Sequence, residues 1–256
     1  MASMSSWSSP PKVFTLERDE VHVWRAALDE WESLTDLWQT LTTDEQTRAN
    51  SFYFPKDRDR FIAARGILRA ILSRYVGSEP RDLRFCYNPY GKPALIQAQT
   101  ENILHFNVSH SNRLALYAIG HNRAVGIDLE YMRSDFPWEQ IAESYFSAQE
   151  NAILRALPAP LKQQAFFNGW TRKEAYLKAV GQGLQIPLDQ FDVSLIPGEP
   201  AELLSTQWNC QETSGWSLQE LLPAPDYAAA LAVAGTHWQL KLWQWSSSRL
   251  DAATGE

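Results

Sequence analysis

The sequence predicts an α+β protein built of two halves, and three observations support this. The 256-residue chain is longer than one typical domain of ~150 residues. Strand and helix patterns occur twice in the same order, with a join near residues 121–125. Hydrophobic residues make up 45% and charged residues 21%, which is typical of a globular protein and excludes a disordered one. We expect residues 13–122 and 123–256 to form the two halves. Residues 1–12, rich in Ser and Pro, are expected to be a flexible tail.

In the first half, residues 21–28 alternate as a strand does, and residues 43–48 form a short helix opened by an N-cap and acidic residues. Pro55 begins a long helix whose apolar residues recur at helical spacing and which Gly77 ends. Short strands then follow at residues 83–87, 105–109 and 113–120, with a turn at 88–95, and a strand at 124–132 opens the second half.

The second half repeats this order. Residues 146–157 and 160–180 have helical patterns, the second ending at Gly181 and Gly183. Strands are predicted at residues 191–196, 215–222, 227–235 and 238–245. Because no literal sequence repeat relates the halves, any symmetry between them is expected to be structural.

Charge narrows the class of ligand. A net charge of -7 argues against a protein that neutralises nucleic-acid phosphates over a broad face. Residues 48–84, however, hold nine Lys/Arg against four acids, so this segment suits a compact polyanion such as a nucleotide, or is a solvated helix face of mixed charge. Two widely spaced cysteines exclude a disulfide scaffold. Without a signal sequence or a long apolar run, we expect a cytoplasmic protein with no membrane or nucleic-acid partner.

The segment VGIDLEY, residues 125–131, is the sharpest local feature. Alternation on a strand places Gly126, Asp128 and Glu130 on one face. Two carboxylates beside a glycine could bind a hard cation such as Mg²⁺. The alternative is the solvent face of an ordinary amphipathic strand.

The segment WTRKEAYLKAVGQGL, residues 170–184, is predicted to be helical. Glu174 and Lys178 lie one turn apart on one stripe and could serve a metal and a phosphate side by side. The alternative is a helix-stabilising Glu–Lys pair, which alone is the simpler interpretation.

Two further motifs are short. In FNVSHS, Ser109 and His110 point to opposite faces of a strand and no GxSxG elbow occurs, so donation to phosphate oxygens is favoured over a hydrolase nucleophile. GKP, residues 91–93, is a turn with a projecting lysine.

Together, and in this order, GKP, FNxSHS, GIDxE and WxxKEAxxKxxGxGL resemble the 4′-phosphopantetheinyl transferases of the Sfp type, especially the cyanobacterial members. The amino half adds a similar RANxFYFxxxRxRFxxxRGILRxIL, and the resemblance covers residues 21–235. It implies a pseudo-twofold fold of two similar α+β halves with the active site in the cleft between them. It also implies Mg²⁺-dependent transfer (Mn²⁺ may substitute) of the phosphopantetheine arm of coenzyme A to a serine of an apo acyl or peptidyl carrier protein, with release of adenosine 3′,5′-bisphosphate.

The resemblance also implies roles for individual residues. Asp128, Glu130 and Glu174 would hold the metal, and Lys178 and His110 would contact the pyrophosphate. Coenzyme A would further be bound by Arg48 at its 3′-phosphate, by Arg65, by the adenine-side turn Tyr90, Gly91, Lys92 and Pro93, and by Ser109. The base that activates the carrier serine would be Glu174, a metal-linked water or Glu150.

A chain of this length that holds both halves is expected to be a monomer. Fatty-acid, polyketide and nonribosomal peptide carriers are all candidate partners. Two other classes stay open at this point: a different metal-dependent phosphoester enzyme, and a non-catalytic sensor of coenzyme A or a nucleotide.

Overall fold

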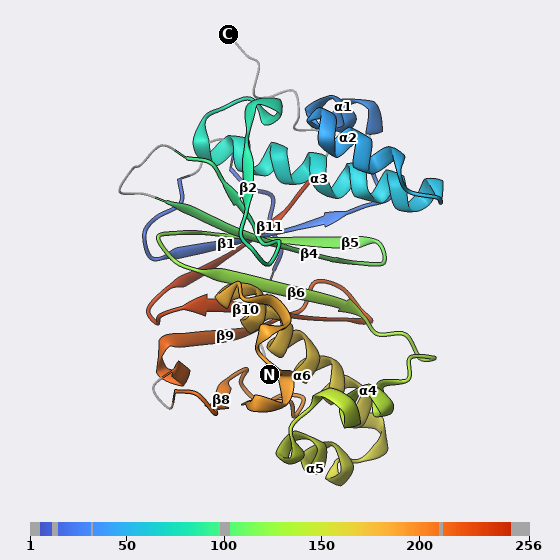
Figure 1. The fold of residues 1–256 in the computed structure, drawn as a ribbon, viewed down its shortest axis with the longest axis vertical. Helices are drawn as coiled ribbons and strands as arrows, with labels where there is room; N and C mark the ends of the chain where they lie inside the picture. Colours follow the sequence, from blue (N-terminus) through green and yellow to red (C-terminus); the bar gives the residue numbers. More distant parts are fainter. Residues whose placement is uncertain (1–5, 12–14, 32, 98–102, 210–211, 247–256) are drawn as a thin grey trace.

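In the computed structural model, two β-sheets pack face to face, and a long helix covers the outer face of each (Figure 1). The structure describes residues 6–11, 15–31, 33–97, 103–209 and 212–246. The layers therefore run helix, sheet, sheet, helix, with α3 at one outside and α6 at the other (Figure 1).

The first half contains one strand, three helices and four strands, in that order. Their bounds are β1 Glu20–Ala27, α1 Leu34–Thr40, α2 Thr43–Asn50, α3 Pro55–Val76, β2 Phe85–Tyr87, β3 Pro93–Leu95, β4 Leu104–Ser111 and β5 Leu114–His121. β1, β5 and β4 form an antiparallel sheet, and β2 and β3 form a separate hairpin.

The second half repeats this sequence of elements. It contains β6 Val125–Tyr131, α4 Trp138–Tyr145, α5 Ala148–Ala156, α6 Ala159–Val180, β7 Phe191–Val193, β8 Leu203–Thr206, β9 Trp216–Leu221 and β10 Tyr227–Ala234. β6, β10 and β9 form the second antiparallel sheet, and β7 pairs with β8. The predicted α+β class with two similar halves is confirmed. Short 3₁₀ turns occur at Pro80–Asp82, Gly183–Gln185, Leu188–Gln190 and Glu212–Gly215.

The last strand, β11 (Gln239–Gln244), leaves its own half. It runs parallel to β1 and extends the first sheet, so the order of that sheet is β11-β1-β5-β4. The predicted strand at 238–245 is therefore present, but it lies in the sheet of the other half. Ser8 also lies along β11, where its backbone N–H bonds Leu242 O at 3.1 Å and its carbonyl accepts from Gln244 N at 2.8 Å. Within the segment expected to be a flexible tail, Ser8 therefore bonds to a sheet edge. Residues 1–5 and 12 lie outside the described part of the chain.

Local chemistry explains the two long helices. Each has a proline in its first turn, where the missing N–H is not needed, and each ends at a glycine with a left-handed backbone, Gly77 at φ 65° and Gly181 at φ 78°. Both helices match the sequence prediction within two residues. The sequence analysis missed α1, α4, β3 and β8, which have eight residues or fewer, whereas helical periodicity is recognised over windows of about 11–18 residues and strand alternation over about 4–8.

The core lies on both sides of each sheet. Between the sheets, Val21, Val23 and Leu116 of the first half meet Val125, Ile127 and Leu129 of the second. On the outer faces, α3 packs against the first sheet and α6 against the second. α6 crosses β6 so closely at Gly126 that an added Cβ would lie 2.1 Å from Ala175 O, which explains a glycine there. No described helix is long and apolar enough to cross a membrane.

Candidate functional site

The candidate site forms where β4 of the first half meets β6 and α6 of the second. One edge of β6 pairs with β10, and no described strand pairs with its other edge. Side chains of β4 bond the backbone of β6 instead. Asn107 Oδ1 accepts from Ile127 N at 2.9 Å, Ser109 Oγ accepts from Leu129 N at 3.2 Å, and Ser111 Oγ accepts from Tyr131 N at 3.0 Å. These three polar residues alternate along β4 and so share one face.

The two carboxylates of β6 point to the face that α6 covers, as the strand alternation predicts. Val125, Ile127 and Leu129 are buried between the sheets, so Asp128 and Glu130 lie on the opposite face. Asp128 Oδ1 accepts from Ser109 Oγ at 3.0 Å, and Glu130 Oε2 accepts from Ser111 Oγ at 3.1 Å. β4 therefore holds both the backbone and the acidic side chains of β6.

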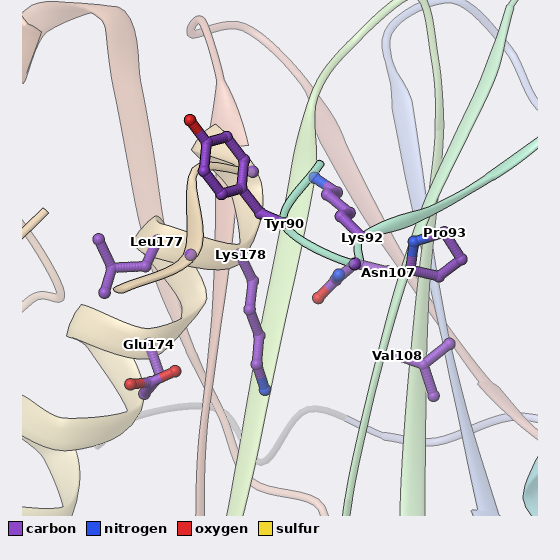
Figure 2. A pocket seen from close by; sticks show the side chains of 11 residues that line it. Tyr90, Lys92, Pro93, Asn107, Val108, Glu174, Leu177 and Lys178 are labelled. Atoms are coloured by element: carbon purple, nitrogen blue, oxygen red, sulfur yellow. The ribbon is translucent and has the colours of Figure 1, made fainter. Parts of the chain in front are cut away.

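Helix α6 supplies the cation of the site. Lys178 Nζ lies 2.5 Å from Asp128 Oδ1 and 3.2 Å from Ser109 Oγ. Glu174 projects from α6 one turn earlier, and Figure 2 shows Glu174 and Lys178 on the same side of a pocket. Lys178 bonds across to β6, so the simple interpretation of a Glu174–Lys178 surface pair does not describe the contact that this lysine makes.

The grouping of acids shifts their protonation. Burial, and then the charge of Asp128, raise the pKa of Glu130 to about 7. Burial and the same charge raise the pKa of Glu174. Burial disfavours the ammonium form of Lys178, but the Asp128 carboxylate outweighs it and the pKa of Lys178 is raised. The site therefore holds more negative charge than its one lysine compensates.

The carboxylates do not converge on one point as they stand. Among the described residues, no group of three or more His, Cys, Asp or Glu side chains is arranged to hold a metal ion. Asp128 uses one carboxylate oxygen for Lys178 and Ser109. Its other oxygen, Oδ2, is buried and has no hydrogen-bond partner within the described chain. A buried carboxylate oxygen without a partner is costly, and a cation would relieve that cost.

A cavity of about 210 Å³ opens beside these residues (Figure 2). Its lining comes from three places: the turn after β2, strand β4 and the C-terminal part of α6. The lining residues are Tyr90, Gly91, Lys92, Pro93, Asn107, Val108, Glu174, Leu177, Lys178, Gly181 and Gly183. The predicted turn Tyr90–Pro93 and the predicted pair Glu174 and Lys178 thus meet in one pocket.

The ammonium of Lys92 is used by the protein itself. Lys92 Nζ donates to Ala179 O at 3.0 Å and to Val125 O at 3.3 Å, and burial lowers the pKa of Lys92 to about 8. Asn88 Nδ2 donates to Gly181 O at 2.7 Å. The turn therefore caps the C-terminal carbonyls of α6, where a cation is favourable, and joins the two halves beside the pocket.

Six predicted ligands lie outside the lining of this cavity. Ser109, Asp128 and Glu130 are among them and lie beside Lys178 or on β6, as described above, and the other three are Arg48, Arg65 and His110. Arg48 of α2 is exposed and stacks over Phe61. Arg65 of α3 bonds Glu45 and donates to Tyr87 Oη at 3.0 Å. His110 is on the face of β4 opposite to Ser109; partial burial, and then the charges of Lys178 and Arg60, lower the pKa of His110.

Glu150 is buried and fully engaged. Its Oε1 accepts from Val193 N at 3.0 Å, and its Oε2 accepts from Ser147 N at 2.9 Å and lies 2.9 Å from Lys173 Nζ. Both Glu150 and Lys173 have almost no exposed surface. The structure therefore places Glu150 in a helix cap and an ion pair, apart from the cavity.

Sequence reasoning missed Asn107 and Ser111, which complete the β4 face, and Lys173, which neutralises Glu150. The signal for the first two was present: Asn107, Ser109 and Ser111 are polar residues at period two on a strand flanked by apolar residues. No such signal identified Lys173. It is adjacent to Glu174 in the sequence, and adjacent residues on a helix face different directions, so Lys173 does not share the face of Glu174 and Lys178.

Comparisons with known proteins identify the family of the chain. A family model described as the 4′-phosphopantetheinyl transferase superfamily matches residues 124–232, and one described as the N-terminal part of 4′-phosphopantetheinyl transferase matches residues 22–121. The chain is 48% identical over 241 residues to the 4′-phosphopantetheinyl transferase HetI of Nostoc, covering 94% of this chain and 98% of that protein.

Two relatives from other bacteria match a smaller part. The 4′-phosphopantetheinyl transferase Sfp of Bacillus subtilis is 31% identical over 59% of this chain and 65% of its own length. The 4′-phosphopantetheinyl transferase gsp of Aneurinibacillus migulanus is 34% identical over 53% of this chain and 54% of its own length.

Proposed function

Because the chain belongs to the 4′-phosphopantetheinyl transferase superfamily, we propose that it transfers the phosphopantetheine arm of coenzyme A to a serine of an apo acyl or peptidyl carrier protein. The family predicted from the sequence motifs is confirmed, and the chain is an enzyme of that class. One observation supports the proposed reaction more than any other: Lys178 bonds both Ser109 and Asp128 at the side of a cavity that Glu174 also lines.

The proposed reaction exchanges one phosphate bond for another. The serine oxygen of the carrier attacks the phosphorus of the 4′-phosphate and loses its proton. The bond from that phosphorus to the bridging oxygen breaks, and adenosine 3′,5′-bisphosphate leaves with the bonding pair. No covalent enzyme intermediate is needed, so the protein has to align the hydroxyl and stabilise charge on two phosphates. Lys178 is placed to stabilise that charge.

We propose that Asp128, Glu130 and Glu174 bind Mg²⁺, which Mn²⁺ can replace. Two features support this: the buried oxygen of Asp128 that has no partner within the described chain, and the closeness of the Glu130 and Glu174 carboxyls, whose pKa values are raised by burial and then by the charge of Asp128. Mg²⁺ prefers a few carboxylates together with phosphate oxygens, so the pyrophosphate would complete its ligands. Bound there, the ion would neutralise charge that develops on the pyrophosphate.

Glu174 is our candidate for the base that accepts the serine proton. Its carboxylate lines the cavity, and without a bound cation burial raises its pKa. Because a metal-bound carboxylate is a poor base, Glu174 would accept the proton only after it releases the ion. Glu150 is disfavoured, because both of its oxygens already accept hydrogen bonds inside the fold.

We propose that the nucleotide binds on the side of the cavity that the Tyr90–Pro93 turn lines, with the main chain of the turn facing the adenine. Lys92 would act through the turn it holds, since its Nζ bonds two backbone carbonyls. His110 and Lys178 would contact the phosphates, Ser109 would orient Lys178, and Arg48 and Arg65 would attract the 3′-phosphate from α2 and α3.

We further propose a monomer that works in the cytoplasm without a nucleic-acid or membrane partner. A single chain supplies both sides of the candidate site, because β4 belongs to one half and β6 and α6 belong to the other. Carriers of fatty-acid, polyketide and nonribosomal peptide synthesis all present a suitable serine.

The test is direct. The protein is mixed with coenzyme A, Mg²⁺ and an apo carrier protein, and the carrier is weighed by mass spectrometry. The proposal expects the carrier to gain one phosphopantetheine group, and to gain none when EDTA removes the metal. A carrier of unchanged mass across fatty-acid, polyketide and peptide types would contradict the transfer. Full conversion in EDTA would contradict the role of Mg²⁺.

A further inference from the structure

The segment of residues 6–11 connects parts of the molecule that belong to different halves. Trp7 packs against the apolar core between the two sheets, and its Nε1 donates to Leu222 O at 3.1 Å, directly after β9 of the second half. Ser8 pairs with Trp243 of β11, the strand that extends the sheet of the first half. One short segment therefore bonds the second half through Trp7 and the first sheet through Ser8.

Arg25 of β1 completes this connection from the first sheet. Strand alternation places Arg25 in the row of β1 residues that face the second sheet. Its guanidinium lies 4.9 Å from the centre of the Trp7 ring, and its Nη1 donates to Pro223 O in the turn after β9. Its Nε donates to Gln244 Oε1 of β11 at 2.8 Å. Trp7, Ser8 and Arg25, which we call the clasp, thus join β1, β11 and the end of β9.

The clasp and the candidate site lie at opposite edges of the two sheets. The first sheet has the order β11-β1-β5-β4, and the second has the order β6-β10-β9. The candidate site is formed at the edges β4 and β6, where side chains of β4 bond the backbone of β6. The clasp connects the edge β11 to the end of β9. The two sheets are therefore bonded to each other at both edges.

Directional bonds at the edges determine how one sheet lies on the other. The contact between the sheets is apolar, with Val21 and Leu116 of the first sheet against Ile127 and Leu129 of the second. Apolar attraction is non-directional, so it holds the sheets together without fixing the angle between them. Hydrogen bonds do depend on angle, so a rotation of one sheet on the other breaks bonds at an edge. Loss of the clasp would remove this constraint at one edge and leave the β4–β6 edge to oppose the rotation.

We propose that the clasp fixes the angle between the two sheets and thereby holds the β4 and β6 side chains of the candidate site in register. Trp7 and Arg25 act through the packing of the sheets, so they are positioning residues at the edge away from the site. The inference does not depend on the proposed reaction, because it concerns the protein without a ligand.

The test is amide hydrogen exchange, followed by NMR in the wild type and in Trp7→Ala. Ser8 N donates to Leu242 O at 3.1 Å and Gln244 N donates to Ser8 O at 2.8 Å, so the amides of Ser8 and Gln244 report on the clasp. The amides of Ile127 and Leu129, which donate to side chains of β4, report on the edge at the site. In Trp7→Ala we expect exchange about tenfold faster or more at the clasp and about threefold faster or more at the site.

Two controls separate this effect from a general loss of stability. The amide of Leu231, in the central strand β10, should keep its exchange rate in Trp7→Ala within about twofold. Trp208→Ala is the matched variant, because Trp208 is also a partly exposed tryptophan and packs edge-on against Phe191, away from the clasp. It should leave the exchange rates at the clasp and at the site within about twofold of the wild type.

Three results would overturn the proposal. Unchanged exchange at Ser8 and Gln244 would mean that Trp7 does not hold the segment in place. Faster exchange at Ser8 and Gln244 with unchanged rates at Ile127 and Leu129 would mean that the segment is attached to a sheet edge without positioning the site. An equal increase at all of these amides and at Leu231 would reduce the clasp to a contribution to overall stability.

Discussion

The two halves of the molecule share one scaffold, but only the second carries the chemical groups. Helix α3 begins at residue 55 and α6 at residue 159, and both have 22 residues. Residues of the two halves that are 104 positions apart are therefore equivalent, as Trp24 of β1 is to Asp128 of β6. The other equivalent pairs at the site are Ala26 and Glu130, Ala70 and Glu174, and Arg74 and Lys178. In the first half Trp24, Ala26 and Ala70 are buried core residues. Where the first half has these three apolar residues, the second has three carboxylates, and both halves have a cation at the fourth position, Arg74 or Lys178.

What the halves share is structural. In each, the third residue of a short helix is a buried glutamate that accepts from the N-cap backbone N–H at 2.9 Å: Glu45 from Thr42, and Glu150 from Ser147. In each, that glutamate pairs with a cation eight residues before the terminal glycine of the long helix, Arg69 or Lys173. Glu45 makes an N-cap hydrogen bond and an ion pair in the half that has no candidate site. The matching contacts of Glu150 are therefore contacts that stabilise the fold.

The two sheets also differ at the edge of their first strand. The edge of β1 is covered by β11, whose Trp243 packs against Trp24. The edge of β6 is bonded by side chains of β4 instead. A strand paired with this edge of β6 would occupy the space beside it, whereas the short side chains of β4 leave space for a ligand. The asymmetry at the two edges therefore explains why one half of a doubled fold can hold a site.

The largest effect is expected from truncating the two equivalent residues of β1 and β6. Asp128→Ala should reduce transfer by about 10²–10³-fold or more with little change in Tm, because the lost group stabilises charge. Trp24→Ala should cost about 3–5 kcal/mol of stability by opening a cavity, with the folded fraction still active. Carrier mass and thermal melting measure both. A Tm loss with unchanged kcat in Asp128→Ala would place Asp128 with the scaffold.

The shared ion pairs should affect stability alone. Glu45→Ala and Glu150→Ala should each cost about 3–5 kcal/mol, because each leaves a buried cation without its partner and removes a helix cap. Denaturant unfolding gives the stability, and single-turnover transfer below the midpoint gives the activity of the folded protein. Should Glu150→Ala lose transfer while its unfolding curve matches the wild type, Glu150 would belong to the chemistry.

A substitution at the edge of β6 should reduce stability less than the loss of a buried ion pair. Asn107→Ala leaves the buried N–H of Ile127 without its acceptor and should cost about 1–3 kcal/mol. Hydrogen exchange should show faster exchange at Ile127 than at Leu129, which keeps Ser109. Unchanged exchange at Ile127 would mean that water or another group replaces the Asn107 acceptor.

The smallest effect is expected at the turn that joins the halves. Lys92→Met removes the cation from Ala179 O and should cost about 1 kcal/mol, raising KM for coenzyme A more than it lowers kcat. Burial lowers the pKa of Lys92 to about 8 from 10.5, so between these pH values the unfolded chain binds more protons and the contribution of Lys92 to stability should rise with pH. The difference in unfolding free energy between wild type and Lys92→Met, measured from pH 7 to 10, checks the sign.

The sequence allowed prediction of elements and motifs that depend on local chemistry. Both long helices and the carboxylate face of β6 agree with the prediction from local chemistry. The Tyr90–Pro93 turn lines one cavity with Glu174 and Lys178, but local chemistry did not predict this, because it was implied only by the family resemblance. The placement of β11 did not follow, because an apolar strand pattern does not identify its neighbour. The hydrogen bonds of Lys92 and the ion pair of Glu150 could not be predicted either, because they depend on which buried atoms the tertiary fold brings near them. The order of elements predicted two similar halves, but no sequence repeat relates them because equivalent residues, such as Trp24 and Asp128, differ in chemistry.

The central claim is that the chemistry resides in side chains added to the second half of a repeated scaffold. Glu174→Ala tests it most directly, since alanine is the residue that the first half has at the equivalent position, Ala70. The variant and the wild type are incubated with coenzyme A, Mg²⁺ and an apo carrier, and the carrier mass is followed alongside the Tm. We predict no detectable transfer in the time that the wild type needs for full conversion, with a Tm equal to or above the wild type because a buried carboxylate is gone. Conversion at the wild-type rate by Glu174→Ala would contradict the claim.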